Sequence, residues 1–163
     1  MISKEQYIES LIAELKIIKH LAEKIKPEQL SHKPTEAQRT TEELMHYLSY
    51  IFIVAVDTIA LGDTDAYKKY SQSKKPTLET FAQMIDKQEM KIRELITPMN
   101  DEILAEEITM WGRTQSRAMH LFGLIKMAAA YKMQLFLYMK QSGTSNIGTS
   151  NLWAGMDQPP KVQ

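Results

Sequence analysis

The chain of 163 residues contains no cysteine. This absence excludes disulfide bonds, thiolate metal ligands and a cysteine nucleophile, although it says little about the cellular compartment. The chain also has no excess of charge of either sign, because 20 Lys and Arg residues balance 20 Asp and Glu residues. Without a net positive field, we expect binding neither to nucleic acid nor to an anionic membrane surface.

A secretion signal is also missing from the N-terminal stretch MISKEQYIESLIAELK, which has no basic region followed by an apolar segment and a small-residue cleavage site. A cytoplasmic location is therefore expected. One domain is expected as well, because a chain of this length buries roughly 70% of its unfolded surface in a single core.

One long apolar run is present, LMHYLSYIFIVAVDTIALG at residues 44–62. It is long enough to be compared with a membrane span, but it contains His46 and Asp57 as well as Ser49 and Thr58. A charged residue near the centre of a bilayer costs about 2.5–3.5 kcal/mol, so a membrane span is not expected. A helix that is apolar nearly all round is typical of the middle of a protein core.

Apolar residues recur at steps of three and four from Ile8 to Ile25, which predicts a first helix. Ser3 and Gln6 have the spacing of a capping box at its start, and Pro27 follows its end. A second capping box, Thr40 with Glu43, predicts a second helix from about residue 41 to 62.

Thr77 is a good N-cap for a third helix over residues 78–97, and a fourth is predicted from about 116 to 141, before Gly143. Residues 100–115 have no sustained period and are expected to form a linker, in which ILAEEITMW could be extended or a short turn of helix. The sequence thus predicts an all-α four-helix bundle over residues 1–143. The tail, residues 144–163, is rich in Gly, Pro, Ser and Asn and is expected to be irregular.

Two segments resemble the DinB/YfiT-like superfamily of four-helix bundles. They are LSHKPTEAQRTTEELMHYL, which leads into the second helix, and HLFGLIKMAAAYKMQLFLYMKQSG in the fourth. Members of that family typically have a Pro-containing loop before a capped second helix, and a fourth helix that reads approximately His-x-x-x-His-Arg-Gly-Gln. The resemblance covers about residues 3–143 and implies the bundle fold, often as a homodimer.

The resemblance also implies a divalent metal held by three histidines. The ligand of the second helix corresponds to His46, the pair of the fourth helix falls on Met127 and Tyr131, and Gln134 matches the family glutamine. Met127 and Tyr131 keep the direction of the missing imidazoles but lack their nitrogen donors. A thioether prefers Cu(I), and a neutral phenol is a poor ligand for zinc or nickel. We therefore expect no cofactor, with Zn or Ni as the alternative.

The other histidines do not restore the set. His120 precedes Met127 by seven residues, about 10 Å along a helix axis, which is too far for one shared ion. His20 belongs to the first helix, and His32 belongs to a connector. The expected role of His46 is a hydrogen bond inside a polar notch, with the Tyr131 hydroxyl as its partner.

Two functions remain open. The preferred one is a non-catalytic DinB-like protein with a degenerate metal site, formed by His46, Met127, Tyr131 and Gln134, that binds a small molecule in the bundle cleft. The alternative, implied by the resemblance, is a metal-dependent S-transferase that uses bacillithiol or mycothiol, or a related hydrolase, in which the metal lowers the pKa of a thiol.

Further expectations concern packing and partners. A homodimer would bury the apolar second helix, and Trp153 is expected to anchor the tail on its own bundle or on a second subunit unless the tail is disordered. Asp57 is expected to accept a hydrogen bond rather than act as an acid catalyst. Arg113 could meet an anion, although a surface role is expected. Most helical methionines are expected to fill gaps in the core: Met84, Met119, Met127, Met133 and Met139.

Overall fold

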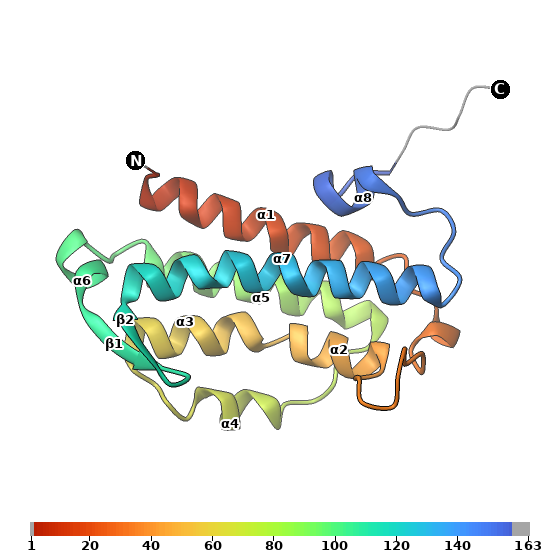
Figure 1. Ribbon diagram of the computed structural model, residues 1–163, viewed down its shortest axis with the longest axis horizontal. Helices are drawn as coiled ribbons and strands as arrows, with labels where there is room; N and C mark the ends of the chain where they lie inside the picture. Colours follow the sequence, from red (N-terminus) through yellow and green to blue (C-terminus); the bar gives the residue numbers. More distant parts are fainter. Residues whose placement is uncertain (1, 158–163) are drawn as a thin grey trace.

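The computed structural model describes residues 2–157, and these residues form a helical bundle (Figure 1). Its long elements are α1 (Lys4–Ala22), α2 (Thr41–Leu48) continued by α3 (Ile51–Leu61), α5 (Leu78–Ile96) and α7 (Arg117–Gln141). α1 packs against α5 and α7, and α3 packs against α5 and α7. The prediction of an all-α bundle is confirmed. The predicted capping boxes Ser3–Gln6 and Thr40–Glu43 are both present.

The second predicted helix is broken between α2 and α3. Tyr50 leaves the helical conformation, with φ −139° and ψ −20°. The fully buried side chain of Gln88 in α5 satisfies the freed backbone groups, since its Nε2 donates to the Leu48 carbonyl (2.8 Å) and its Oε1 accepts from the Phe52 N–H (3.2 Å). A break inside a core needs such partners, because unpaired backbone groups are costly there.

The apolar run lies inside this bundle. Thr41–Leu61 is long and apolar enough to cross a membrane, but 67% of its most apolar window is buried. α4 (Ala66–Ser71), α5 and α7 cover α3. The segment is therefore the core of a soluble fold. Most of its apolar surface is thus covered within one chain, although Leu61 is 63% exposed.

The segment predicted as a linker, residues 100–115, is more ordered than expected. It contains α6 (Asp101–Ala105) and an antiparallel hairpin of β1 (Glu107–Met110) and β2 (Arg113–Ser116). The strands pair from Glu107 with Ser116 to Met110 with Arg113. A hairpin of four-residue strands is too short to produce a recognisable sequence period, so the sequence indicated only that part of this segment could be extended or a short turn of helix.

The prediction of a wholly irregular tail was wrong. α8 (Thr149–Ala154) lies on α1, beside the bundle (Figure 1). The residues that suggested a loop are its caps: the Gly148 N–H donates to Asn151 Oδ1 (2.8 Å), and Gly155 adopts the left-handed conformation. Together with η1 (Pro27–Gln29), a single 3₁₀ turn after α1, α8 completes the described helices.

The tail docks on its own bundle, but Trp153 is not the anchor. Leu152 and Asn151 are buried, whereas Trp153 is 67% exposed. The Asn151 side-chain amide lies 3.1 Å from His20 Nε2. The Trp153 ring instead lies over the buried Lys132 ammonium, 5.0 Å from the ring centroid, and that ammonium is 2.7 Å from Glu14 Oε2.

Two smaller predictions have different outcomes. Asp57 is buried and accepts a hydrogen bond from the Tyr70 hydroxyl (3.0 Å), as expected. The core role of the methionines is confirmed for Met139 and wrong for Met119 and Met133, which are 51% and 38% exposed on the outer face of α7. The remaining two, Met84 and Met127, are half-buried.

Candidate ligand pocket

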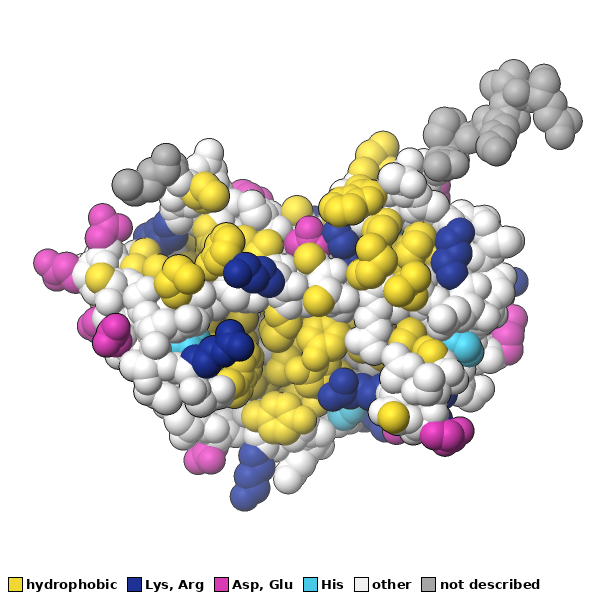
Figure 2. Space-filling view, viewed as in Figure 1, with side chains coloured by type: hydrophobic (Ala, Val, Ile, Leu, Met, Phe, Trp, Pro, Cys, Tyr) yellow, Lys and Arg dark blue, Asp and Glu magenta, His cyan; other side chains and the backbone are white. Residues whose placement is uncertain are grey.

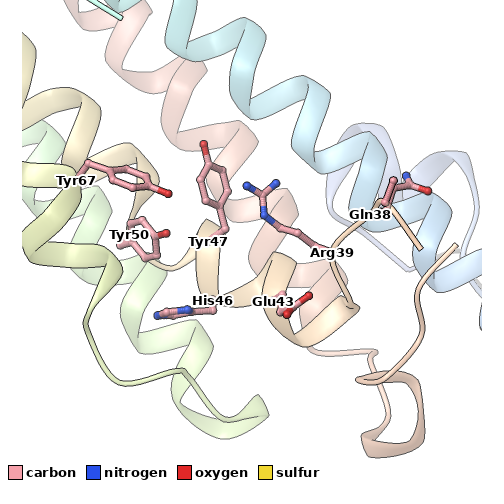
Figure 3. A pocket seen from close by; sticks show the side chains of 8 residues that line it. Gln38, Arg39, Glu43, His46, Tyr47, Tyr50 and Tyr67 are labelled. Atoms are coloured by element: carbon pink, nitrogen blue, oxygen red, sulfur yellow. The ribbon is translucent and has the colours of Figure 1, made fainter. Parts of the chain in front are cut away.

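His46 lies at the edge of a pocket of about 340 Å³ between the connector that precedes α2, the α2–α3 break and α4. Figure 3 shows the side chains that line it, with Tyr50 and Tyr67 facing each other and Arg39 beside Tyr47. The complete lining is Ala37, Gln38, Arg39, Glu43, His46, Tyr47, Tyr50 and Tyr67. We call this space the tyrosine pocket.

The contacts of His46 differ from the prediction. Its Nε2 lies 3.1 Å from the Ser73 carbonyl, and its ring meets that of Tyr50 edge-on, with centroids 5.3 Å apart. Tyr131 packs instead against Tyr47, with ring centroids 5.1 Å apart. These contacts replace the expected hydrogen bond between His46 and the Tyr131 hydroxyl. His46 thus holds the loop after α4 against α2.

Four tyrosines from four parts of the chain form a continuous aromatic wall. Tyr47 comes from α2, Tyr50 from the helix break, Tyr67 from α4 and Tyr131 from α7. The ring centroids of Tyr47 and Tyr50 are 5.7 Å apart, and those of Tyr50 and Tyr67 are 6.2 Å apart. These are edge-to-face separations, at which aromatic pairs attract one another.

Burial changes the ionisation of two tyrosines of this wall, Tyr47 and Tyr50. Burial raises the pKa of Tyr50 to about 12, and the neighbouring Tyr67 hydroxyl adds to the effect. Burial also raises the pKa of Tyr47 well above its usual range, with a smaller contribution from Tyr131. A phenol with a raised pKa is not deprotonated near neutral pH and so supplies no phenolate base, but it still donates and accepts hydrogen bonds.

The pocket is lined by two charged side chains, Arg39 and Glu43, which differ in their hydrogen-bond partners. The Arg39 guanidinium lies over the Tyr47 ring, 4.4 Å from its centroid, and forms no ion pair with any residue in the range 2–157. The carboxylate of Glu43 is already engaged, since it accepts from the Thr40 N–H (2.8 Å). That backbone hydrogen bond lowers the pKa of Glu43. The pocket therefore combines phenol hydroxyls, one hydrogen-bonded carboxylate and one free guanidinium.

The structure separates the other predicted site residues from His46. Met127 lines a second pocket, of about 350 Å³, beside the hairpin. Gln134 donates to the Tyr138 hydroxyl (3.0 Å) and lines a third pocket, of about 440 Å³. Of the three, only Tyr131 packs against a residue of the tyrosine pocket, Tyr47, although it does not line the pocket itself.

Comparisons with known proteins identify the fold. No family model matches the chain. The uncharacterized protein YjoA of Bacillus subtilis is 23% identical over 150 residues, which are 90% of this chain and 96% of that protein. The crystal structure of the DinB-like YjoA matches with a TM-score of 0.72 at 20% identity, over 88% of this chain and 96% of the other. A DinB-like protein from Bacillus cereus matches with a TM-score of 0.70 at 19% identity, over 89% and 96%.

The chain has the DinB-like fold. The resemblance seen in the sequence is thus confirmed at the level of the fold.

The residues of this DinB-like chain do not fit the metal that the resemblance implies. Within residues 2–157, no three His, Cys, Asp or Glu side chains converge on one point. Positions 127 and 131 supply no nitrogen. His120 is buried against the hairpin, with Nε2 at 3.1 Å from the Ile108 carbonyl, and His20 contacts Asn151 of α8. These side chains therefore do not form the three-histidine set that such a metal needs.

Sequence reasoning had not singled out Arg39, Tyr47, Tyr50 or Tyr67. A partial signal existed, because Tyr47 and Tyr50 are three residues apart in an expected helix and so share a face. The other two lie in a connector and a six-residue helix, where no period indicates which way a side chain points.

Proposed function

We propose that this DinB-like protein binds a small organic anion in the tyrosine pocket and does so without a metal ion. The observation that carries this proposal is the unpaired Arg39 guanidinium stacked on Tyr47. A guanidinium held by an aromatic ring keeps its N–H donors free, and their fork geometry matches a carboxylate or a phosphate. The tyrosine rings supply apolar surface for the body of the ligand, and their hydroxyls supply hydrogen bonds.

A binding role accounts for the pocket better than the alternative of a metal-dependent S-transferase or hydrolase. Activation of a thiol or of water needs a metal ion or a positioned base. The phenols of Tyr47 and Tyr50 have raised pKa values, Glu43 caps a helix, and His46 is hydrogen-bonded to the Ser73 carbonyl. Because the two phenols have raised pKa values and Glu43 and His46 already have hydrogen-bond partners, none of these groups is available as a base. This supports ligand binding and argues against transfer chemistry.

The test is calorimetric titration with 2-naphthoate, and with 2-naphthamide as its neutral analogue, on untagged protein with and without EDTA. We expect 2-naphthoate to bind and 2-naphthamide to bind much more weakly. Arg39→Gln should weaken naphthoate binding about tenfold or more, the equivalent of a hydrogen bond to a charged group of ~1.5–3 kcal/mol.

Arg93→Gln is the matched control, because Arg93 is engaged in surface ion pairs with Glu9 and Glu89. It should leave the affinity unchanged. Equal binding of the acid and the amide, or binding that disappears with EDTA and returns with Zn or Ni, would contradict the proposal.

A homodimer and a cytoplasmic location stay proposals. The surface that supports a homodimer is on α7 and not on the predicted second helix. It consists of four exposed apolar side chains: Met119, Phe122, Met133 and Leu137. Exposed apolar rows of this kind are typical of interaction surfaces. Sedimentation of the wild type and of Phe122→Glu tests it: a dimer that Phe122→Glu dissociates supports the proposal, and a monomeric wild type contradicts it.

A further inference from the structure

One face of α7 runs from a contact with the tyrosine pocket to a second pocket beside the hairpin. Gly123, Met127 and Tyr131 recur every four residues and so share one face of α7, over about 12 Å of helix. Tyr131 touches Tyr47 of the tyrosine pocket, whereas Met127 and Gly123 line the pocket beside the hairpin. Figure 2 shows hydrophobic side chains gathered in a hollow between α7 and the α3–α4 layer, with Lys or Arg and His side chains at both ends.

Gly123 has no side chain to fill the part of this hollow that it lines. It lies inside α7, where glycine is a poor helix former. No close packing explains it, because a Cβ at this position would have no atom within 4 Å. The absence of a side chain therefore has one visible effect, which is to widen the pocket that Gly123 lines.

The hairpin ends in a strained aromatic residue at the same place. Trp111 has φ +51° and is 58% exposed, although Asn, Asp or Gly is the usual residue in such a turn. Other residues hold the hairpin on α7, since the buried His120 contacts the Ile108 carbonyl (3.1 Å) and Gln115 Nε2 (3.2 Å). Trp111 is thus free to contact a ligand, and strain of this kind is often found at functional sites.

A second free arginine stands at the hairpin end. Arg113 lines the pocket with Trp111 and forms no ion pair among the described residues. Glu106, which precedes the hairpin, pairs instead with Arg117 (3.1 Å). The hollow therefore has a guanidinium at each end, Arg39 and Arg113, and between them Tyr131, Met127 and Gly123 contribute no charge.

We infer that the two pockets form one groove and that its ligand is an elongated molecule with an apolar body and an acidic group at each end. The Arg39 end of this inference rests on the proposed function. The Arg113 end, with Trp111 and Gly123, is independent of it.

The experiment compares dodecanedioate with dodecanoate and with the shorter hexanedioate, by calorimetric titration of the full chain. We expect dodecanedioate to bind at least tenfold tighter than either, because only it can reach both arginines. Arg113→Gln should remove the preference for the diacid over the monoacid. Gly123→Leu, whose side chain would enter the open space, should weaken dodecanedioate binding at least tenfold.

Trp111→Asn separates a binding role from a structural one. Asn suits the left-handed conformation, so the melting temperature should stay the same or rise while dodecanedioate binding weakens at least fivefold. Arg93→Gln again serves as the unaffected control.

The inference is overturned if dodecanedioate binds no tighter than dodecanoate, or if Arg113→Gln and Gly123→Leu both leave its affinity unchanged. Parallel titration with 2-naphthoate separates the two proposals. If 2-naphthoate binding still requires Arg39, only the extended groove fails. If 2-naphthoate binding does not require Arg39 either, both the extended groove and the proposed function are wrong.

Discussion

The side-chain amide of Gln88 donates a 2.8 Å hydrogen bond to the backbone carbonyl of Leu48, at the last residue of α2. The same side chain accepts from the N–H groups of Phe52 and Ile53. One buried residue of α5 therefore holds open the break that places Tyr47 and Tyr50 on the wall of the tyrosine pocket.

The first prediction concerns this residue. Gln88→Leu should lower the free energy of unfolding by roughly 2–4 kcal/mol, because it leaves three backbone groups without partners inside the core. Urea unfolding measures the loss. Gln83→Leu is the matched control, since Gln83 is exposed on the same helix and its change should have little effect. Equal effects of the two substitutions would show that the amide of Gln88 is not needed at the break.

The second prediction contrasts two glycines. Gly123→Ala should stabilise the protein by about 1 kcal/mol, because alanine is the better helix former and its Cβ meets no atom within 4 Å. Gly155→Ala should destabilise it by about 1 kcal/mol, because Gly155 has φ +60° and its Cβ would lie 3.3 Å from Ile17 Cγ1. Thermal unfolding of both variants checks the opposite signs, and a shared sign would contradict this account of the two positions.

The third prediction concerns the buried ion pair between α1 and α7. Lys132 Nζ lies 2.7 Å from Glu14 Oε2, and the side chains are 4% and 20% exposed. Lys132→Met should destabilise the protein by about 3 kcal/mol, because it leaves a largely buried carboxylate unpaired. Adding Glu14→Gln to that variant should recover part of the loss, as measured in a double-mutant cycle by urea unfolding. Simple additivity of the two changes would mean that the pair is not coupled.

The fourth prediction follows from the tyrosine wall. Burial raises the pKa of Tyr50 to about 12, whereas an unfolded tyrosine ionises near pH 10. Between these values the unfolded chain loses a proton that the folded chain keeps, so stability should fall as pH rises above about 10. The expected loss from Tyr50 is on the order of 1 kcal/mol at pH 11. Urea unfolding at pH 8 and pH 11 measures it, and Tyr50→Phe should reduce the difference. An unchanged pH dependence in Tyr50→Phe would contradict this assignment.

The parts of the fold that could be predicted from the sequence depend on nearby residues. The caps at Ser3, Thr40 and Thr77 all act on backbone groups three residues ahead, so local spacing was enough to place the helix starts. The helix break could not be predicted in this way. Its stabilising partner, Gln88, is 40 residues from Leu48 and appears in the sequence only as one polar residue in a helical pattern.

The candidate site was predicted less well than the fold for the same reason. His46 was recognised because it interrupts an apolar run, but its partners Ser73 and Tyr50 replaced the expected Tyr131. Arg39 and Tyr67 reach the pocket from a connector and a short helix, and only tertiary packing brings them together. Trp111 gave no signal, because its left-handed conformation contradicts the usual preference of tryptophan.

The seat of α8 on α1 has a consequence for how this protein is made. His20 leaves the ribosome before its partner Asn151, which lies 131 residues later in the chain. One flank of α1 therefore stays uncovered until α8 has been translated. A nascent chain halted before α8 leaves that flank exposed to solvent.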